Sequence, residues 1–277
     1  MKKAKSLSLS VAILLMQGAS SLCWGVEKAG AVSILLSSEI EWEQLNPARG
    51  DKSPQAGTLW GDRKGEVATG FLAKFVDGFS SPPHIHNATY RAVVISGLIH
   101  NDDPAAEKMW MPPGSFWTQP KGESHITAAK GDTNIALVEI DQGPYLVMHA
   151  DEAFDSGERP INIDPSNLVW LDVPGFETSA INPKQVYLWG SLKEGESNGS
   201  FIELPAGFEG TLQTTGDVFR AVVIKGELHY KGSTGKTLDP GSYLGATGIV
   251  DHPIQSSQAS ETIIYIRTNG SYKLSAE

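Results

Sequence analysis

The sequence predicts an all-β protein made of two similar units in tandem. Three observations lead to this prediction: an internal repeat, short segments rich in β-branched and aromatic residues, and frequent turn residues, with 29 Gly and 16 Pro among 277 residues. No long helical period separates the glycines and prolines, so extended helices are not expected.

The internal repeat has a constant offset of 129 residues, which shortens to 127 after a two-residue deletion. The matching segments, first copy then second, are 59–61 and 188–190, 78–79 and 207–208, 91–95 and 220–224, and 113–115 and 240–242. A collinear repeat of this length predicts two copies of one fold in a single chain.

Each copy is predicted to consist of short strands. The clearest expected strands are 90–95, 134–140, 219–224 and 262–266, which are rich in β-branched or aromatic residues and are bounded by turn residues. The polar segment 151–166 contains two prolines and is typical of a connection between domains. The expected units are therefore 38–150 and 167–277, joined by the linker 151–166.

Residues 1–25 are predicted to be a secretory signal peptide. Lys2, Lys3 and Lys5 precede an apolar run that is too short to anchor the chain in a bilayer, and Cys23 and Gly25 place small residues at positions −3 and −1 of a cut before Val26. A lipoprotein cut at Cys23 is the alternative, which the large Leu22 disfavours. We therefore expect a periplasmic or secreted protein with no membrane attachment after cleavage.

Composition narrows the partners of the mature chain. The only cysteine of the sequence lies in the predicted signal peptide, so the mature chain would have none. Its hydrophobic core therefore has to stabilise the fold without disulfides. The formal net charge of −10 argues against nucleic acid and against anionic membrane surfaces as partners. A small-molecule ligand or substrate is the partner that remains.

Three histidines form a candidate metal site. His84 and His86 are two residues apart, so on a β-strand both side chains point to the same face. A third ligand has to come from another strand of a curved sheet, and His125 is available for it.

The spacing around these histidines resembles the two conserved motifs of the cupin superfamily, and the resemblance extends through the duplication to nearly the whole mature chain. The first motif comprises Gly78, His84, His86, Tyr90 and Gly97, and the second comprises Gly114, Pro120, Gly122 and His125. The chain is most similar to an uncharacterised family of two-domain cupins, or bicupins. The resemblance implies two tandem antiparallel jelly-roll barrels, with the histidines pointing into the lumen of the first.

Two departures from the cupin pattern bear on the metal. Tyr90 stands where the usual glutamate ligand would be, and Ala129 stands where the second motif usually has asparagine. The resemblance therefore implies a divalent transition metal on three neutral imidazoles, with open coordination positions as in catalytic sites. Imidazole ligands suit Zn, Fe, Ni or Cu and select none of them.

The second copy serves as an internal comparison. At the positions of His84 and His86 it has Gln213 and Thr215, so no equivalent metal site is expected there. His252 keeps the position of His125, and we expect it to be a hydrogen-bonded residue of the lumen. Arg91 and Arg220 are retained in both copies, which favours ion pairing or contact between barrels; likewise Trp60 and Trp189 are expected to pack in the core.

Tyr90 and Glu123 are the candidate catalytic residues. The Tyr90 hydroxyl could ligate the metal, donate a hydrogen bond to a substrate, or donate one to water on the metal. Phe219 replaces Tyr90 in the second copy, which assigns packing to the ring itself. Glu123 lies two residues before His125 and could share its face as a general base or fourth ligand, or could be a solvated turn residue.

Two functions fit this pattern. The first is a metal-dependent enzyme, dioxygenase-like by its resemblance to three-histidine cupins, which acts on a small chelating substrate. The second is a non-catalytic periplasmic protein that binds or senses a small ligand or a metal. The family resemblance also leaves a homodimer open.

Overall fold

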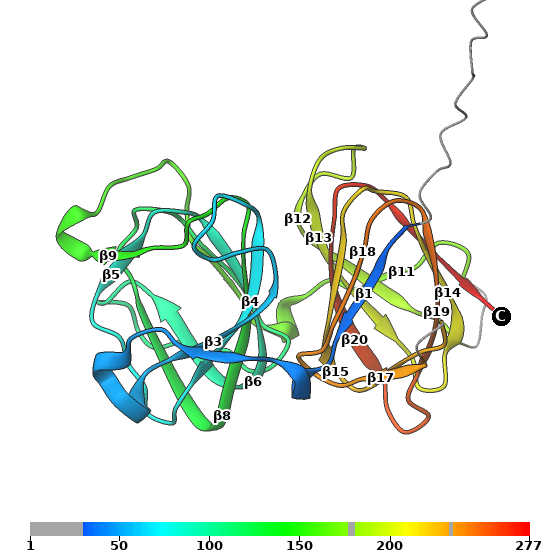
Figure 1. The fold of residues 1–277 in the computed structure, drawn as a ribbon, viewed down its shortest axis with the longest axis horizontal. Helices are drawn as coiled ribbons and strands as arrows, with labels where there is room; N and C mark the ends of the chain where they lie inside the picture. The colour runs from blue at the N-terminus through cyan, green and yellow to red at the C-terminus, as the bar shows by residue number, and fades with distance from the viewer. Residues whose placement is uncertain (1–29, 177–180, 233–234) are drawn as a thin grey trace, which may run out of the picture.

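The computed structural model of this protein describes residues 30–176, 181–232 and 235–277; the predicted signal peptide lies outside them. In this part of the chain, two antiparallel barrels stand side by side (Figure 1), and the predicted all-β class with two tandem jelly-roll barrels is confirmed. The described helices are short 3-10 turns, and none of them has the length and apolar character needed to cross a membrane.

The first repeat contributes β1 (Val32–Leu35), β2 (Trp42–Gln44), β3 (Gln55–Trp60), β4 (Thr69–Phe75), β5 (His84–His86), β6 (Tyr90–Asp102), β7 (Phe116–Gln119), β8 (Ile126–Ile140) and β9 (Val147–His149). The second contributes β10 (Ile161–Ile163), β11 (Leu171–Asp172), β12 (Lys184–Gly190), β13 (Asn198–Leu204), β14 (Glu209–Thr214), β15 (Phe219–Lys225), β16 (Leu228–Tyr230), β17 (Lys236–Leu238), β18 (Tyr243–Ala246), β19 (Val250–Ser256), β20 (Thr262–Thr268) and β21 (Tyr272–Ala276). The 3-10 turns are η1 (Ser37–Glu39), η2 (Pro47–Lys52), η3 (Ala150–Glu152) and η4 (Pro165–Asn167).

Each barrel is built around a large sheet. In the first barrel the strand order is β10-β7-β6-β8-β4-β3-β2, and the pair β5-β9 lies apart from it. In the second barrel the order is β1-β18-β15-β20-β13-β12-β11, opposed by the sheet β17-β16-β19-β14-β21. The predicted strands at 90–95, 134–140, 219–224 and 262–266 lie within β6, β8, β15 and β20, at the centres of the two large sheets.

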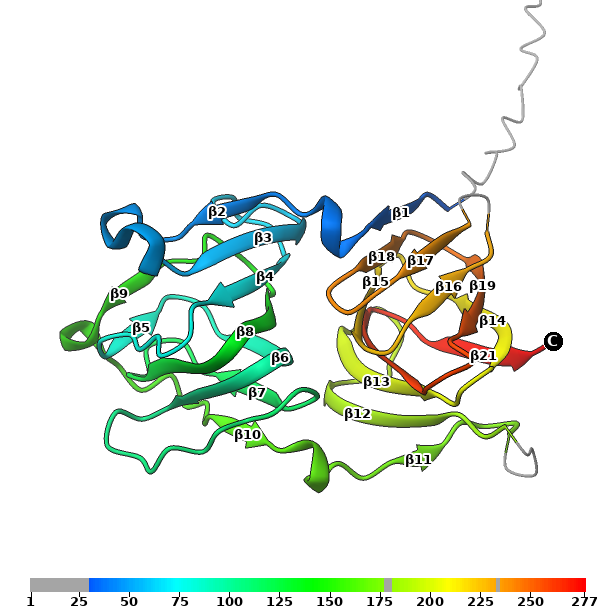
Figure 2. The same ribbon diagram turned by 90° about the horizontal axis from the view of Figure 1, so that it is seen from below.

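The two repeats exchange their first strands. Strand β1, from the start of the chain, pairs with β18 of the second barrel, and β10 pairs with β7 of the first barrel. Val32 and Ile161 are 129 residues apart, so β1 and β10 occupy equivalent places in the repeat. Figures 1 and 2 both show β1 lying along the second barrel. The segment 151–166, expected as a linker, thus also supplies an edge strand to the first barrel.

Both faces of each large sheet are apolar, and both are buried. Along β6, Ala92 and Val94 face the interior of the first barrel, whereas Val93 and Ile95 face the second barrel. Strand β15 alternates in the same way between the interior of the second barrel and the shared interface. A strand covered on both faces has a continuous apolar run, which is why Ala-Val-Val-Ile recurs in both repeats.

The tryptophans retained by both repeats were expected to pack in the core; they pack, half-buried, against the hydrophobic cluster at the interface between the barrels. Trp60 stacks on Tyr243 of the other barrel, with ring centroids 5.4 Å apart. The Trp60 ring also covers Gly70, where an added Cβ would lie 2.1 Å from the indole, and Trp189 covers Gly199 in the same manner. The paired recurrence of tryptophan and glycine in the sequence therefore reflects direct contact.

Arg91 crosses from the first barrel to the second. Its guanidinium lies 3.7 Å from the ring centroid of Trp189, and it forms an ion pair with Asp141 at 3.0 Å. The expectation that this arginine serves contact between barrels is confirmed. Arg220, its counterpart, instead donates to the backbone carbonyls of Phe219 and Ala246.

A buried carboxylate completes the interface. Glu139 of β8 is 1% exposed and accepts a hydrogen bond from the Tyr265 hydroxyl at 2.7 Å. The Arg267 guanidinium, 5% exposed, lies 3.3 Å from Glu139 and 2.7 Å from Asp141. Burial raises the pKa of Glu139, while Arg267 and Arg91 oppose that shift. This charge network joins β8 of one barrel to β20 of the other.

Replacing Arg267 by methionine is expected to lower the free energy of unfolding by about 3–5 kcal/mol, because the Glu139 carboxylate would stay buried without its cation. Adding Glu139→Gln to this variant should restore much of the loss, since no unpaired buried charge remains. Arg159→Met is the matched control: its ion pair with Asp155 is solvent-exposed, so its loss should leave the free energy of unfolding nearly unchanged. Urea unfolding measures all three variants, and equal losses for Arg267→Met and Arg159→Met would contradict the role of the buried network.

Candidate metal centre

Two segments far apart in the sequence bring the three histidines together. His84 and His86 lie at the ends of β5 and are separated by Ile85, which is fully buried. His125 directly precedes β8, and its backbone pairs with that of His84 through two reciprocal N–H···O bonds of 3.0 Å. Residues 84 and 125 are therefore direct neighbours in an antiparallel pair, which places both side chains on one face.

The three imidazoles form a compact cluster. One ring nitrogen of each lies within 4.8 Å of the corresponding nitrogens of the other two. The rings of His84 and His125 are closest, with centroids 4.2 Å apart. His86 and His125 are almost completely buried, at 3% and 1% exposure, whereas His84 is half-buried. The cluster is thus enclosed on one side and accessible on the other.

The outer nitrogen of each ring is held by a backbone carbonyl. Nδ1 of His84 contacts the carbonyl of Pro82 at 3.0 Å, Nδ1 of His86 that of Leu146 at 2.9 Å, and Nδ1 of His125 that of Glu123 at 3.2 Å. A carbonyl only accepts hydrogen bonds, so each Nδ1 carries the proton and each Nε2 presents a lone pair. Metal-ligating histidines are commonly oriented in this way.

The Nε2 atoms fit a metal ion. Nε2 of His125 is buried and has no hydrogen-bond partner within the part of the chain that the structure describes. An unsatisfied buried acceptor is costly, and coordination to a cation would satisfy it. Burial lowers the pKa of all three imidazoles, well below the usual value for His86 and to about 3 for His125, and the neighbouring rings add to the shift at these two. The histidines are therefore neutral at pH 7, as metal ligands have to be.

Tyr145 joins the cluster and was missed by the sequence analysis. Its hydroxyl lies 3.2 Å from Nε2 of His86, and its ring stacks on the His86 ring with centroids 4.5 Å apart. Burial raises the pKa of Tyr145 well above its usual value, so the phenol keeps its proton. Tyr145 lies in the connection between β8 and β9, outside both recognised motifs, and only its aromatic character could have marked it.

Tyr90 lies beside the histidines, but its hydroxyl is hydrogen-bonded to Asn101 and not to the cluster. The ring lines the same cavity and lies edge-on to His86, with centroids 5.2 Å apart. The hydroxyl donates to Oδ1 of Asn101 at 2.9 Å, and Thr127 donates to the same oxygen. Burial raises the pKa of Tyr90, so this phenol also stays protonated. The hydroxyl thus belongs to a buried polar network.

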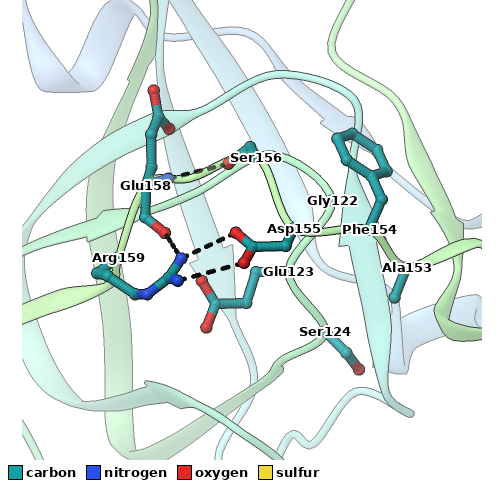
Figure 3. Close-up of a pocket in the computed structure, with 9 residues that line it drawn as sticks. All are labelled: Gly122, Glu123, Ser124, Ala153, Phe154, Asp155, Ser156, Glu158 and Arg159. Carbon is teal, nitrogen blue, oxygen red and sulfur yellow. Dashed lines mark hydrogen bonds and ion pairs between the residues drawn. The ribbon is translucent and has the colours of Figure 1, made fainter.

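Glu123 does not reach the histidine cavity. Its side chain lines a surface pocket with Asp155 and Arg159 (Figure 3). The expectation that it shares the face of His125 required extended backbone, but β8 begins only at Ile126, after the turn at 121–122. Glu123 contributes through its backbone instead, because its carbonyl accepts from His125 Nδ1 and from Gln119 Nε2.

A cavity of about 290 Å³ opens beside the histidines. His84, His86 and Tyr145 lie on its wall, and the rest is mainly apolar, with Phe71 and Trp117 among the lining residues. Among the described residues that line it, none is an aspartate or glutamate. The volume suits a small molecule, and the arrangement is typical of a ligand site with a few polar groups in an apolar wall.

The equivalent position of the second barrel is packed shut. His252 is fully buried and stacks on Phe219, with ring centroids 5.0 Å apart. Neither of its ring nitrogens has a hydrogen-bond partner among the described residues, so the expectation of a hydrogen-bonded histidine was wrong. Apolar side chains, Phe208 and Leu212 among them, fill the interior around it.

Comparison with known proteins supports the fold and leaves the activity open. The family described as Domain of unknown function (DUF4437) matches residues 33–275. No curated protein matches the sequence.

Solved structures share the architecture at low sequence identity. A putative dioxygenase from Nostoc punctiforme PCC 73102 superimposes with a TM-score of 0.67 and 12% identity, over 89% of this chain and 86% of that one. Oxalate decarboxylase from Lactobacillus farciminis, in complex with formate, gives a TM-score of 0.55 and 11% identity over 88% of both chains. Vicilin from hazelnut, Corylus avellana, gives 0.53 and 10% over 88% and 87%. At these identities the similarity shows the fold alone.

Tyr90→Phe tests whether the phenol is a ligand. Because its hydroxyl donates to Asn101, the variant should retain the wild-type metal content and lose about 1 kcal/mol of unfolding free energy from the buried network. Elemental analysis and urea unfolding measure the two quantities. A loss of bound metal in a folded Tyr90→Phe protein would show that the hydroxyl coordinates the ion after all.

The buried His252 predicts a pH dependence of stability. Burial lowers its pKa from 6.5 to about 4, so above pH 6.5 it is neutral in both the folded and the unfolded chain. Between pH 6.5 and 4 the unfolded chain binds the proton and the folded chain does not, and stability falls by about 3 kcal/mol from this group. In metal-free protein, wild type should lose that much more unfolding free energy over this range than His252→Leu; parallel pH profiles would contradict the assignment.

Proposed function

Since the chain belongs to the family described as Domain of unknown function (DUF4437), we propose a function from its site. The first barrel holds one divalent transition ion on Nε2 of His84, His86 and His125. The chain is exported to the periplasm or secreted, by the signal peptide predicted at residues 1–25. There it acts as a metal-dependent enzyme on a small chelating substrate, with dioxygenase-like chemistry.

The proposal rests on one observation: all three Nδ1 atoms are hydrogen-bonded to backbone carbonyls. Each Nε2 can then offer its lone pair to a metal ion. One ring nitrogen of each histidine lies within 4.8 Å of those of the other two, and His84 and His86 line the cavity. Zn, Fe, Ni and Cu all suit this ligand set. A divalent ion with open positions polarises the oxygen of a bound carbonyl or enolate and, as iron, supplies dioxygen chemistry.

The protein's own residues fit such a substrate. Aromatic side chains, Phe71 and Trp117 among them, keep the wall of the cavity apolar and restrict water. Tyr145 places a neutral phenol next to His86, where it can donate a hydrogen bond to an oxygen beside the cluster. The structural similarity to a putative dioxygenase and to oxalate decarboxylase also supports a metal-dependent reaction.

A second candidate, a non-catalytic carrier or sensor of a small ligand or a metal, is favoured by a different observation. No carboxylate lines the cavity among the described residues, and the Tyr90 hydroxyl is bound to Asn101. The two candidate catalytic groups, the Tyr90 hydroxyl and the Glu123 carboxylate, are therefore not presented to a ligand. A binding protein needs no such group.

His86→Ala is expected to lower metal affinity by more than about 100-fold, since removal of even an outer-sphere partner of a ligand costs 10–100-fold. His229→Ala is the matched control, because His229 lies in the second barrel, where its ring contacts Thr237. Elemental analysis of both proteins purified from their native compartment gives the metal content and identity. Equal metal content in the two variants would refute the site.

Oxygen-consumption and product assays against diketones, thiols and phenols separate the two candidates. An enzyme should turn over at least one class, and turnover should disappear in His86→Ala while persisting in His229→Ala. Tight binding of such compounds without any conversion by the metal-loaded protein would favour the carrier or sensor.

A further inference from the structure

Arg49 differs from the other arginines of the chain. All six arginines lie in the described residues, and the other five each form an ion pair with a carboxylate or donate to backbone carbonyls. The Arg49 guanidinium has no such partner among those residues; it lies over the ring of Phe79, 5.3 Å from the centroid. It is half-buried. A half-buried guanidinium without an acceptor is an open site for an anion.

The Arg49 side chain lies on the wall of the histidine cavity. Arg49 lines the same cavity as His84 and His86, and it also borders a neighbouring hollow of about 430 Å³ together with Lys52. Among the described residues of that wall, Arg49 is the only arginine, lysine, aspartate or glutamate. The protein as a whole carries a formal charge of −10. One unpaired cation in an apolar cavity of an acidic protein favours an anionic ligand over a neutral one.

The segment that carries Arg49 is held in place by its own hydrogen bonds. Leu45 N donates to the carbonyl of Pro54 at 2.8 Å, which closes the loop at its base. Asn46 N donates to Oγ of the buried Ser53 at 2.9 Å, and Arg49 N donates to the carbonyl of Asn46 at 3.0 Å. The loop therefore presents the guanidinium from a fixed backbone, as a preorganised binding group requires.

Comparison of the two repeats shows that Arg49 is particular to the first barrel. At the offset of 129 its counterpart is Thr178, just as His84 and His86 are replaced by Gln213 and Thr215. Phe79 is retained as Phe208, but there the ring is covered by Phe176, with centroids 6.0 Å apart. Both of those rings are buried in the core of the second barrel. In the second repeat, which lacks the histidine pair, Phe176 thus packs over Phe208. In the first repeat Arg49 lies over the equivalent ring, Phe79.

We infer that the first barrel takes an anionic small molecule, whose apolar body fills the cavity between the histidines and Arg49 and whose anionic group binds the Arg49 guanidinium. This inference rests on the proposed function and supplies the class of its ligand. A carboxylate accepts two parallel hydrogen bonds from a guanidinium, and a phosphate or sulfonate does the same. The ring of Phe79, 5.3 Å from the guanidinium, adds a cation–π contact that helps to hold it in place.

Calorimetric titration with paired probes tests the inference. The probes are aliphatic and aromatic monocarboxylates of increasing length, the primary amide of each, and phenyl phosphate to separate a phosphate from a carboxylate preference. At least one acid should bind wild type about tenfold or more tightly than its amide. Arg49→Gln should abolish that difference, and Arg49→Lys should retain part of it.

Lys52→Gln is the matched control, because it removes the same charge from the same 3-10 turn without touching the histidine cavity. It should change the affinity less than about twofold. Circular dichroism of Arg49→Gln checks that the barrel is intact, and added salt should weaken acid binding to wild type but not to Arg49→Gln. Equal binding of acids and amides, unchanged acid binding by Arg49→Gln, or no binding of any acid would overturn the inference.

The titrations are run on metal-free and on zinc-loaded protein, so that the two proposals fail separately. Acid binding that depends on Arg49 in a protein that takes up no metal would overturn the proposed function and keep this inference. Metal bound to the histidines, together with acid binding that Arg49→Gln leaves unchanged, would keep the proposed function and overturn this inference.

Discussion

Burial of both faces of the two large sheets is the constraint on which this structure depends. In β6, neighbouring residues alternate between the interior of the first barrel and the interface with the second, and both sets are apolar. Neither barrel could expose its outer face to water without a large loss of hydrophobic free energy. The two repeats therefore fold against each other, and the exchange of β1 and β10 fixes which faces meet.

The histidine cluster lies on the side of the first barrel that faces away from the second barrel (Figure 1). There β5 is paired only with β9 and, at His84, with the residue before β8. This local backbone pairing sets the distance between the histidines, while carbonyls of three different segments fix the orientation of their rings. The second barrel has the same fold but lacks the histidine cluster, and aromatic and aliphatic side chains fill its interior.

Sequence spacing was informative where the partners of a residue were local or repeated. The i, i+2 relation of His84 and His86 follows from strand geometry, and the retention of Arg91 in both repeats led to the expectation of an ion pair or a contact between barrels. For Glu123 spacing left two placements open, the face of His125 or a solvated turn. The structure has the second, because the alternation of side chains begins only with β8. Tyr145 and Arg49 gave no signal, since each reaches the cavity from a connecting segment outside the motifs.

The sequence by itself determined the class of fold, the duplication and the identity of the three clustered histidines, because periodicity and repeats are properties of the chain alone. The tertiary structure decided which strands are exchanged, which ring nitrogens stay free, and which side chains complete the cavity. Those features depend on contacts between residues that are distant in sequence, such as His86 with the carbonyl of Leu146. Residues 86 and 146 are 60 positions apart, and only the folded backbone of the first barrel brings them together.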